Sequence, residues 1–343
     1  MQADNFDRPA KSRIVSASFV EHRLRVILTL YKGTFASGSN STTIDDLAIS
    51  AKIQKLPFPD FGKASIEITN MPLDDMEKLT TLAFHPLYQT RNYVNVYAGD
   101  DVHGYTEIFA GNIVRAAADL NSTPDVKLKV EAQVGFWGRI TADGATAVRG
   151  SQPAADFIAG QVQKAGFTFE NRGVTAQLRN SVFNGSPIHQ AMKAAKQVGA
   201  ELILDDNRAI LIPAGGAVNT AGNAILINKD TGLLKYPTVT QNGIELTTIF
   251  NPALRFAGIF KLETEVPKAS GTWRIIKLSH DLSANSPRQG KWESKITGFY
   301  PHMSGAIGRF IYWLLTKMTS AVYSAPVPLR AISTSCNIAL SST

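Results

Sequence analysis

The sequence lacks the features that define several classes of protein. It has one cysteine, Cys336, which excludes a disulfide framework and any metal site built from several cysteines. Charged residues are 18% of the chain, fewer than usual, which favours a surface partly buried in an assembly. The net charge of +7 is spread thinly and is not interleaved with aromatic residues, so a dedicated nucleic-acid binder is not expected. Residues 1–13 are polar without an apolar core, so we expect no secretory signal and folding in a cytoplasm.

Motifs for catalysis and cofactor binding are also missing. The segment 62–65, Gly-Lys-Ala-Ser, has the lysine of a phosphate-binding loop but not the first glycine at the required spacing. No His-Glu-x-x-His, nucleophile elbow or Gly-x-Gly-x-x-Gly occurs. The six histidines are scattered along the chain: His22, His85, His103, His189, His280 and His302. The sequence therefore predicts no catalytic, cofactor-binding or metal-ligating residue, no cofactor, and no enzyme activity.

Several polar residues are close enough in sequence to be weighed as sites, and each has a structural interpretation. Ser186 and His189 are predicted to belong to a helix start rather than to a nucleophile and its base. Cys336 has no nearby histidine and is predicted to be inert. Four acid pairs lie in expected turns, loops or helix starts, where Asp is favoured locally. These pairs are Asp45-Asp46, Asp74-Asp75, Asp100-Asp101 and Asp205-Asp206.

The first 140 residues read mostly as β-structure. Apolar and polar residues alternate over 126–131, which places one face on a core and one in water. Further strands are predicted over 66–69, 93–97 and 107–114. One helix is expected over 73–82, with Pro72 in its first turn, and residues 33–43 are expected to be a flexible loop.

Residues 138–153 are rich in small and turn-forming residues, and we expect a domain boundary there. Helix and strand then alternate. Helices are predicted over 154–164 and 186–198, the second with Ser186 as N-cap, Pro187 at the first helical position and Gly199 after its end. A β-hairpin follows, with strands at 201–204 and 209–212 joined by the turn 205–207.

From about residue 232 the chain becomes β-rich again. Alternating apolar residues predict one long strand over 254–262, followed by strands over 272–278 and 291–299. Phe256 and Trp273 are predicted core residues of this unit. Residues 306–323 are apolar but too short and too charged for a membrane span, so we expect a segment that docks on a partner or on its own domain. A tail rich in Ser, Thr, Pro and Ala completes the chain.

Three groups of short motifs resemble the baseplate hub proteins of contractile-tailed bacteriophages. The first group is Ile66-Glu67-Ile68-Thr69-Asn70, followed by Val94-Asn95-Val96-Tyr97-Ala98-Gly99 and Ile108-Phe109-Ala110-Gly111-Asn112-Ile113. The second group is 191–199 with the hairpin over 202–212. The third group comprises the segments 231–240, 243–246, Phe250-Asn251-Pro252, 271–273, 278–282 and 290–292. The resemblance covers about residues 60–300.

The resemblance implies an α+β, mainly β fold in which two tail-tube-like β-barrel domains flank a small α+β domain. The expected divisions are 1–145, 146–220, 221–303 and a C-terminal apolar segment with a tail at 304–343. It also implies a homotrimeric ring that adapts the sixfold tail tube to the threefold central spike and forms part of the DNA-ejection channel. The implied partners are the spike, the tube and baseplate wedge or tape-measure proteins, and DNA passes without specific binding. The implied location is the virion tail baseplate, after assembly in the host bacterial cytoplasm.

Two other readings stay open. One is a further structural protein of a tail or secretion device, either at the tail tip or anchored to a membrane through residues 306–323. The other is a tail-associated cell-wall hydrolase, which would need a pair of carboxylates facing each other across a cleft.

Overall fold

The computed structural model describes residues 21–80, 91–100, 102–121, 124–219, 221–241, 243–286 and 290–300, all within one compact unit spanning Met1–Pro301. The segments 306–323 and 324–343, with Cys336, lie outside the described residues. No helix in the described ranges is long and apolar enough to cross a membrane.

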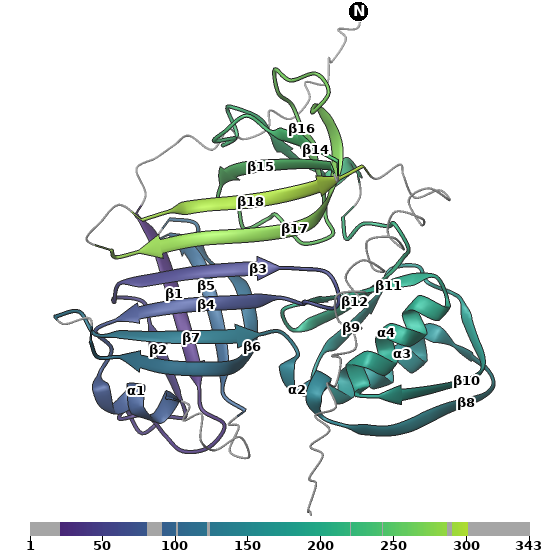
Figure 1. Ribbon diagram of the computed structural model, residues 1–343, viewed down its shortest axis with the longest axis horizontal. Coiled ribbons are helices and arrows are strands. Elements are labelled where there is room, and N and C mark those ends of the chain that lie inside the picture. The colour runs from purple at the N-terminus through teal and green to yellow at the C-terminus, as the bar shows by residue number, and fades with distance from the viewer. Residues whose placement is uncertain are drawn as a thin grey trace, which may run out of the picture. The chain divides into compact units, whose positions relative to one another are not determined.

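A 13-stranded sheet is the main element of the described part of the chain (Figure 1). Its N-terminal strands are β1 (His22–Thr29), β2 (Ser41–Ile44), β3 (Ile49–Lys55), β4 (Lys63–Thr69), β5 (Tyr93–Asp100), β6 (Gly104–Asp119) and β7 (Lys127–Gln133). Its C-terminal strands are β13 (Ile225–Ile227), β14 (Thr238–Thr240), β15 (Gly243–Ile249), β16 (Ile259–Leu262), β17 (Gly271–Ala284) and β18 (Trp292–Phe299). Alternation places one face of each strand on the core: in β7, Leu128, Val130 and Ala132 are buried. The strands expected over 66–69, 93–97, 107–114, 126–131, 272–278 and 291–299 are therefore confirmed.

The described sheet runs continuously from β14 to β2, in the order β14-β15-β18-β17-β3-β4-β7-β6-β5-β1-β2, with β16 beside β17 and β13 beside β16. The N-terminal strands join the C-terminal ones through antiparallel pairing of β3 with β17, from Ile49 opposite Ala284 to Lys55 opposite Leu278. The described strands thus form one sheet with β2, β14 and β13 as its outer strands and no closed barrel, where the resemblance implied two tail-tube-like β-barrel domains.

Two sections of this sheet repeat the same topology. The first section has the order β3-β4-β7-β6-β5, and the second has the order β14-β15-β18-β17-β16. When the five strands of each section are numbered along the chain, both sections have the sheet order first, second, fifth, fourth, third. Every neighbouring pair in both sections is antiparallel. The sequence predicted two related β units but shows no repeat, because alternation constrains only which residues are apolar and not which apolar residue is used.

Residues 143–213 contribute most of the helical structure. Helices α3 (Ala154–Lys164) and α4 (Pro187–Gln197) pack against two small sheets. One sheet pairs β8 (Asp143–Pro153) with β10 (Gln177–Gly185), and the other has the order β11 (Ala200–Asp205), β12 (Arg208–Pro213), β9 (Thr168–Asn171). Ser186 accepts from the backbone N–H of His189 as the N-cap of α4, with Pro187 following. The helices over 154–164 and 186–198 and the β11–β12 hairpin are confirmed, but 143–153, expected as turns, is a strand.

Two short helices complete the described part. Helix α1 (Leu73–Leu79) is shorter than the expected 73–82, because Thr80 turns to an extended conformation and bonds through its hydroxyl to the Met76 carbonyl. Pro72 is the N-cap rather than a first-turn residue. Helix α2 (Phe136–Ile140) was not expected. The loop expected over 33–43 ends earlier, since β2 begins at Ser41.

The prediction of one long strand over 254–262 is wrong for the first half of that range. Only β16 is extended there, because Ala257 has a φ of +58° and the N–H of Gly258 bonds to the Arg255 carbonyl in a turn. Leu254 and Phe256 are nevertheless buried, since each packs in a different core. Leu254 belongs to the cluster with Trp273 and Phe260, whereas Phe256 packs with the β11–β12 hairpin. Trp273 is therefore confirmed as a core residue of the C-terminal β unit, and Phe256 is corrected to the hairpin core.

Candidate functional site: a buried ion-pair junction

The β11–β12 hairpin is covered on both faces, which buries the turn at its end. Leu202, Leu204 and Leu211 lie in the large core that also holds α3 and α4. The alternate residues Ile203 and Ile210 pack on the other face with Phe256. Successive residues of a strand point to opposite faces of the sheet. Because β11 and β12 are each a continuous apolar run, the hairpin presents apolar side chains on both of its faces.

The turn itself is a two-residue loop, Asp206-Asn207, between the last residue of β11 and the first of β12. Asp206 has a φ of +57°. Short hairpin loops require this left-handed conformation, and Asp and Asn adopt it more readily than most side chains. The local sequence thus forms the predicted turn and aims two adjacent carboxylates out of its tip.

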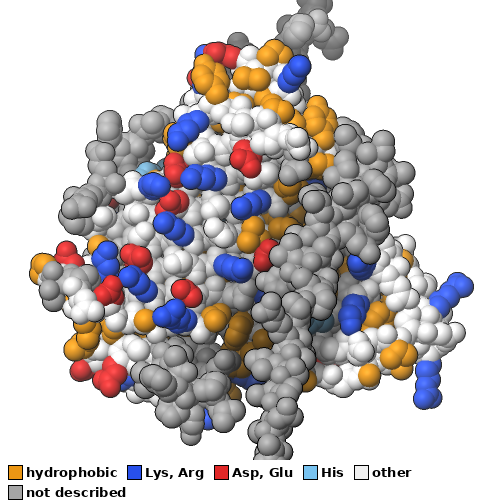
Figure 2. Space-filling model, in the orientation of Figure 1, with side chains coloured by type: hydrophobic (Ala, Val, Ile, Leu, Met, Phe, Trp, Pro, Cys, Tyr) orange, Lys and Arg blue, Asp and Glu red, His pale blue; other side chains and the backbone are white. Residues whose placement is uncertain are grey.

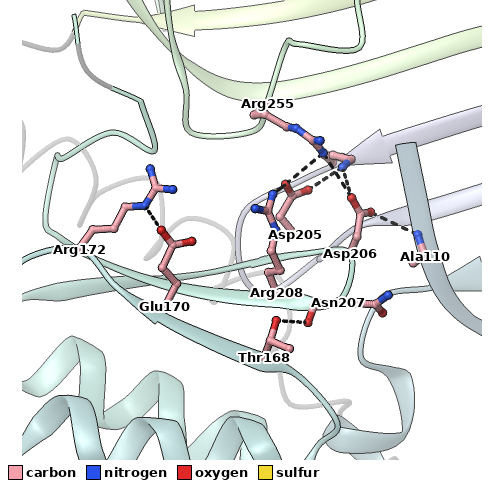
Figure 3. A network of polar contacts seen from close by, with 10 residues as sticks. Ala110, Thr168, Glu170, Arg172, Asp205, Asp206, Asn207, Arg208 and Arg255 are labelled. Carbon is pink, nitrogen blue, oxygen red and sulfur yellow. Dashed lines mark hydrogen bonds and ion pairs between the residues drawn. The ribbon is translucent and has the colours of Figure 1, made fainter. Parts of the chain in front are cut away.

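Lys55, Asp205, Asp206 and Arg255 form a cluster that we call the junction (Figure 3). The Nζ of Lys55, at the end of β3, lies 2.5 Å from Oδ1 of Asp205 and 2.8 Å from Oδ2 of Asp206. The Nη1 of Arg255 lies 3.8 and 3.7 Å from the same two carboxylates. The side chains of Lys55 and the two aspartates are each at least nine-tenths buried. The junction therefore ties the hairpin to β3 on one side and to the segment before β16 on the other.

Further polar contacts surround the junction. The backbone N–H of Ala110, in β6, donates to Oδ1 of Asp206 over 3.3 Å. The hydroxyl of Tyr93, in β5, donates to Oδ1 of Asn207. Nη2 of Arg274, in β17, lies 2.8 Å from Oε2 of Glu201 in β11. The same hairpin therefore bonds to both repeated sections of the large sheet.

Burial and charge act on the junction in opposite directions. Burial alone would lower the pKa of Lys55, but the two aspartates outweigh it and raise that pKa. Burial likewise favours protonation of Asp205, yet the charge of Lys55 and its hydrogen bond hold the pKa of Asp205 below its usual value. Burial, with the neighbouring Asp205 charge, raises the pKa of Asp206. Asp205 is therefore the permanent counter-ion of Lys55, and Asp206 is the carboxylate that takes up a proton first.

A buried histidine lies next to the junction. His280, in β17, is 2% exposed, and its Nδ1 lies 2.8 Å from the hydroxyl of Ser294. Its ring meets the ring of Phe250 edge-on at a centroid distance of 5.2 Å. Burial lowers the pKa of His280 to about 3, and the charges of Lys55 and Arg255 add to this effect. His280 is neutral in the folded protein.

This histidine leads to a pH prediction. Between about pH 6.5 and pH 3 the unfolded chain binds a proton at His280 and the folded chain does not, so stability falls as the pH drops through this window. We expect His280 to contribute a loss of about 3 kcal/mol between pH 7 and pH 4. His280→Gln should lose that much less over the same range in urea titrations. The raised pKa of Asp206 acts in the opposite direction but is present in both proteins, so the comparison isolates His280. Equal losses in the two proteins would contradict the assignment.

Several of the other polar residues weighed from the sequence make structural contacts. Ser186 caps α4, with its hydroxyl 2.9 Å from Nδ1 of His189. Asp75 accepts from the N–H of Ala36, and Asp100 accepts from the N–H groups of the turn after β5. Among the described residues no group of three or more His, Cys, Asp or Glu has the arrangement of a metal site.

The interpretation of Asp205-Asp206 as only a turn was incomplete. The turn is present, but both carboxylates are buried against Lys55, which is 150 residues away in the chain. The sequence does carry one indication of this burial. Both faces of the hairpin strands are apolar, which indicates that the turn between them is buried. The charges of Lys55, Asp205 and Asp206 face one another and are closed to solvent, with the partly exposed Arg255 beside them. This arrangement holds parts of the chain together rather than offering groups to a substrate.

A family model described as "Baseplate hub gp41" matches residues 23–288. The chain is similar to the 43 kDa tail protein of prophage MuSo2 from Shewanella oneidensis, with 10% identity, a TM-score of 0.56, and coverage of 82% of this chain and 98% of that one. It is similar to the tail protein from Neisseria meningitidis MC58, with 9% identity, a TM-score of 0.54, and coverage of 81% and 96%. At these identities the similarity shows a shared fold. No curated protein matches by sequence.

Proposed function

The chain belongs to the baseplate hub gp41 family, and on that premise we propose that three copies form a ring that adapts a sixfold tail tube to a threefold central spike. Family membership makes the chain a structural protein of a bacteriophage tail baseplate. The ring, its copy number and its role in genome ejection are the steps that we add.

The repeated five-stranded section is the observation that carries this proposal. Each chain presents two sections with the same strand order. Three chains in a ring would present six such sections, which matches six subunits of a tube on one side and three of a spike on the other. A closed ring forms when a contact between unlike surfaces repeats by a rotation that closes.

The junction supports the same proposal. Symmetry matching requires the two sections of one chain to be held at a fixed spacing. The junction connects the hairpin to β3 of the first section and to the segment that leads into β16 of the second. The junction also holds the buried acid pair Asp205-Asp206 in ion pairs, which supports a non-enzymatic role. In this proposal the tube-like units are residues 1–145 and 221–303, the α+β unit is 146–220, and 304–343 contacts a neighbour.

The solvent face of the sheet is compatible with passage of DNA. Lys and Arg are interspersed with Asp and Glu over this face (Figure 2). Exposed charged residues of the sheet strands include Lys52, Lys129, Lys295, Glu131 and Glu245. Phosphate contacts hold a nucleic acid in proportion to the number of unpaired cations. Because opposite charges are mixed there, the face would allow DNA to move past without specific binding. The proposed neighbours are the spike, the tube and baseplate wedge or tape-measure proteins, in a particle assembled in the host cytoplasm.

The copy number tests this function. Light scattering on the purified chain, alone and mixed with its spike protein, is expected to give the mass of three 37.1 kDa chains, or that mass plus the spike. A chain that stays monomeric at high concentration and also with the spike would contradict the proposed ring.

A further inference from the structure

Helix α2 carries two side chains that the proposed function leaves unused, Trp137 and Arg139. The helix packs closely on α4 through Gly138 between them, since a Cβ at this glycine would lie 2.8 Å from Cδ1 of Ile188. Trp137 and Arg139 are only partly buried. A short helix that is held firmly on a longer one thus presents an indole and a guanidinium at fixed positions.

Cations and aromatic rings alternate around α2, although they are far apart in the sequence. The guanidinium carbon of Arg139 lies 4.7 Å from the centre of the Phe61 ring, in the segment 56–62 that joins β3 to β4. The guanidinium carbon of Arg91 lies 5.2 Å from the centre of the Trp137 ring and 5.9 Å from that of the Tyr31 ring. We call these five residues the α2 surface.

Exposed apolar side chains border the α2 surface. Phe58 is 45% exposed, and its ring meets the Phe61 ring edge-on at a centroid distance of 5.7 Å. Ile140, the last residue of α2, is 47% exposed, and the Tyr31 ring is also largely open to solvent. A ligand of this surface would therefore bring apolar groups as well as charge.

The positive charge of the α2 surface is not neutralised within the described residues. There, Arg91 and Arg139 contact rings and form no ion pair. Asp60, the acid whose charge acts on Arg139, is itself exposed and lies 3.7 Å from the ammonium of Lys63. Burial lowers the pKa of Arg139. Burial also lowers the pKa of the nearby His189, and the charges of Arg139 and Lys193 add to this effect.

Hydrogen-bond donors are also left unpaired on α2. Nη1 of Arg139 and Nε1 of Trp137 are closed to solvent, and neither donates to an acceptor in the part of the chain that the structure describes. Unpaired buried donors are unfavourable, most of all on a charged group. An acceptor with a negative charge would relieve both the missing bond and the uncompensated charge of Arg139.

The stacking of the guanidinium groups decides which anion fits. A guanidinium over a ring keeps its N–H groups at its edge, where they can bond a carboxylate through two parallel hydrogen bonds. Single-stranded nucleic acids need open ring faces for their bases. Here Arg91 lies over Trp137, and Phe61 is 3% exposed under Arg139. The α2 surface therefore suits carboxylates better than nucleotides.

We propose that the α2 surface binds an acidic peptide segment of a partner protein, with carboxylates of the segment on Arg91 and Arg139. Apolar residues of the same segment pack on Phe58 and Ile140. The partner is identified by charge complementarity: two unpaired guanidinium groups with apolar side chains beside them match a segment in which acidic and apolar residues alternate.

The repeated sections differ at this surface, which fixes its copy number. In the first section, residues 56–62 join β3 to β4 and supply Phe58 and Phe61. In the second section, β14 and β15 are joined by residues 241–242 alone, so these two rings have no counterpart there. Each chain thus binds one segment. In the proposed ring, on which this step rests, three segments bind, and the partner is threefold rather than sixfold.

Fluorescence anisotropy with a labelled peptide of alternating Glu and Leu tests the site on the full chain. We expect saturable binding of one peptide per chain, weakened about tenfold or more by Arg139→Gln because a charged hydrogen bond is lost. Arg91→Gln changes an exposed residue, leaves the cores intact and should weaken binding likewise. The matched control is Arg149→Gln, since Arg149 is an exposed arginine of β8 outside the α2 surface, and it should bind as the unmodified chain does.

Three results would contradict parts of this inference. Unchanged binding in both Arg91→Gln and Arg139→Gln, or an equal loss in Arg149→Gln, would overturn the site. A single-stranded oligonucleotide that binds more tightly than the peptide, and loses its affinity in Arg139→Gln, would overturn the choice of partner. Light scattering on the same samples separates the site from the ring. A trimer that does not bind the peptide overturns the inference and leaves the ring standing, and a monomer that binds it overturns the ring and leaves the site.

Discussion

Replacing Lys55 by methionine is expected to lower the free energy of unfolding by about 3–5 kcal/mol. The substitution keeps the length of the side chain but removes the cation that neutralises Asp205 and Asp206, both of which are nearly inaccessible to water. Arg255 remains, but its Nη1 is 3.7–3.8 Å from the carboxylates and cannot replace contacts of 2.5 and 2.8 Å. Urea denaturation at pH 7 measures the effect.

The control separates the loss of a contact from the burial of unpaired charge. Adding Asp205→Asn and Asp206→Asn to Lys55→Met removes the uncompensated carboxylates, and we expect this triple variant to recover most of the lost stability. Asp60 is a suitable comparison, because its pair with Lys63 is exposed; Lys63→Met should change stability by less than about 1 kcal/mol. A loss of that small size for Lys55→Met would show that the junction does not hold the sections together.

Truncating Trp273 to alanine is expected to cost about 3–5 kcal/mol. Trp273 is 3% exposed, packs in the cluster with Phe260 and Leu278, and donates its indole N–H to the Ala269 carbonyl over 2.9 Å. Trp273→Phe keeps most of the volume and should cost clearly less. Denaturation followed by circular dichroism measures both variants without depending on the fluorophore that is removed.

Phe256→Ala provides the matched comparison in the other core. Phe256 is 6% exposed against Ile203 and Ile210, so we expect a loss of similar size. Its effect should be concentrated in the hairpin, and amide hydrogen exchange should increase in β11 and β12 more than in β17. A loss under about 1 kcal/mol for either residue would show that it is not held in a core.

Local patterns in the sequence predicted the local structure well. The alternation over 126–131 and the Ser186-Pro187 helix start each depend on neighbours a few residues apart, and both have the expected form. The expected strand over 254–262 failed because apolar alternation also arises when a turn sends successive side chains into two cores. No pattern in the chain marks Ala257 as left-handed.

The junction and the repeat could not be predicted from the sequence because both depend on distant pairings. Lys55 meets Asp205 only because β3 runs beside β17 and the hairpin folds back against them. The repeat follows from strand order and pairing, which leave few marks in the residues when one face of a strand is polar. Family resemblance predicted two related β units, and the strand pairing shows how they are joined.

A threefold reconstruction of the intact tail by electron cryomicroscopy tests the central claim most directly. We expect three copies of this chain in one ring between tube and spike, with six five-stranded sections around the axis. Six copies at that level, or single copies at the periphery with the two sections of each chain facing different partners, would contradict the proposed adaptor.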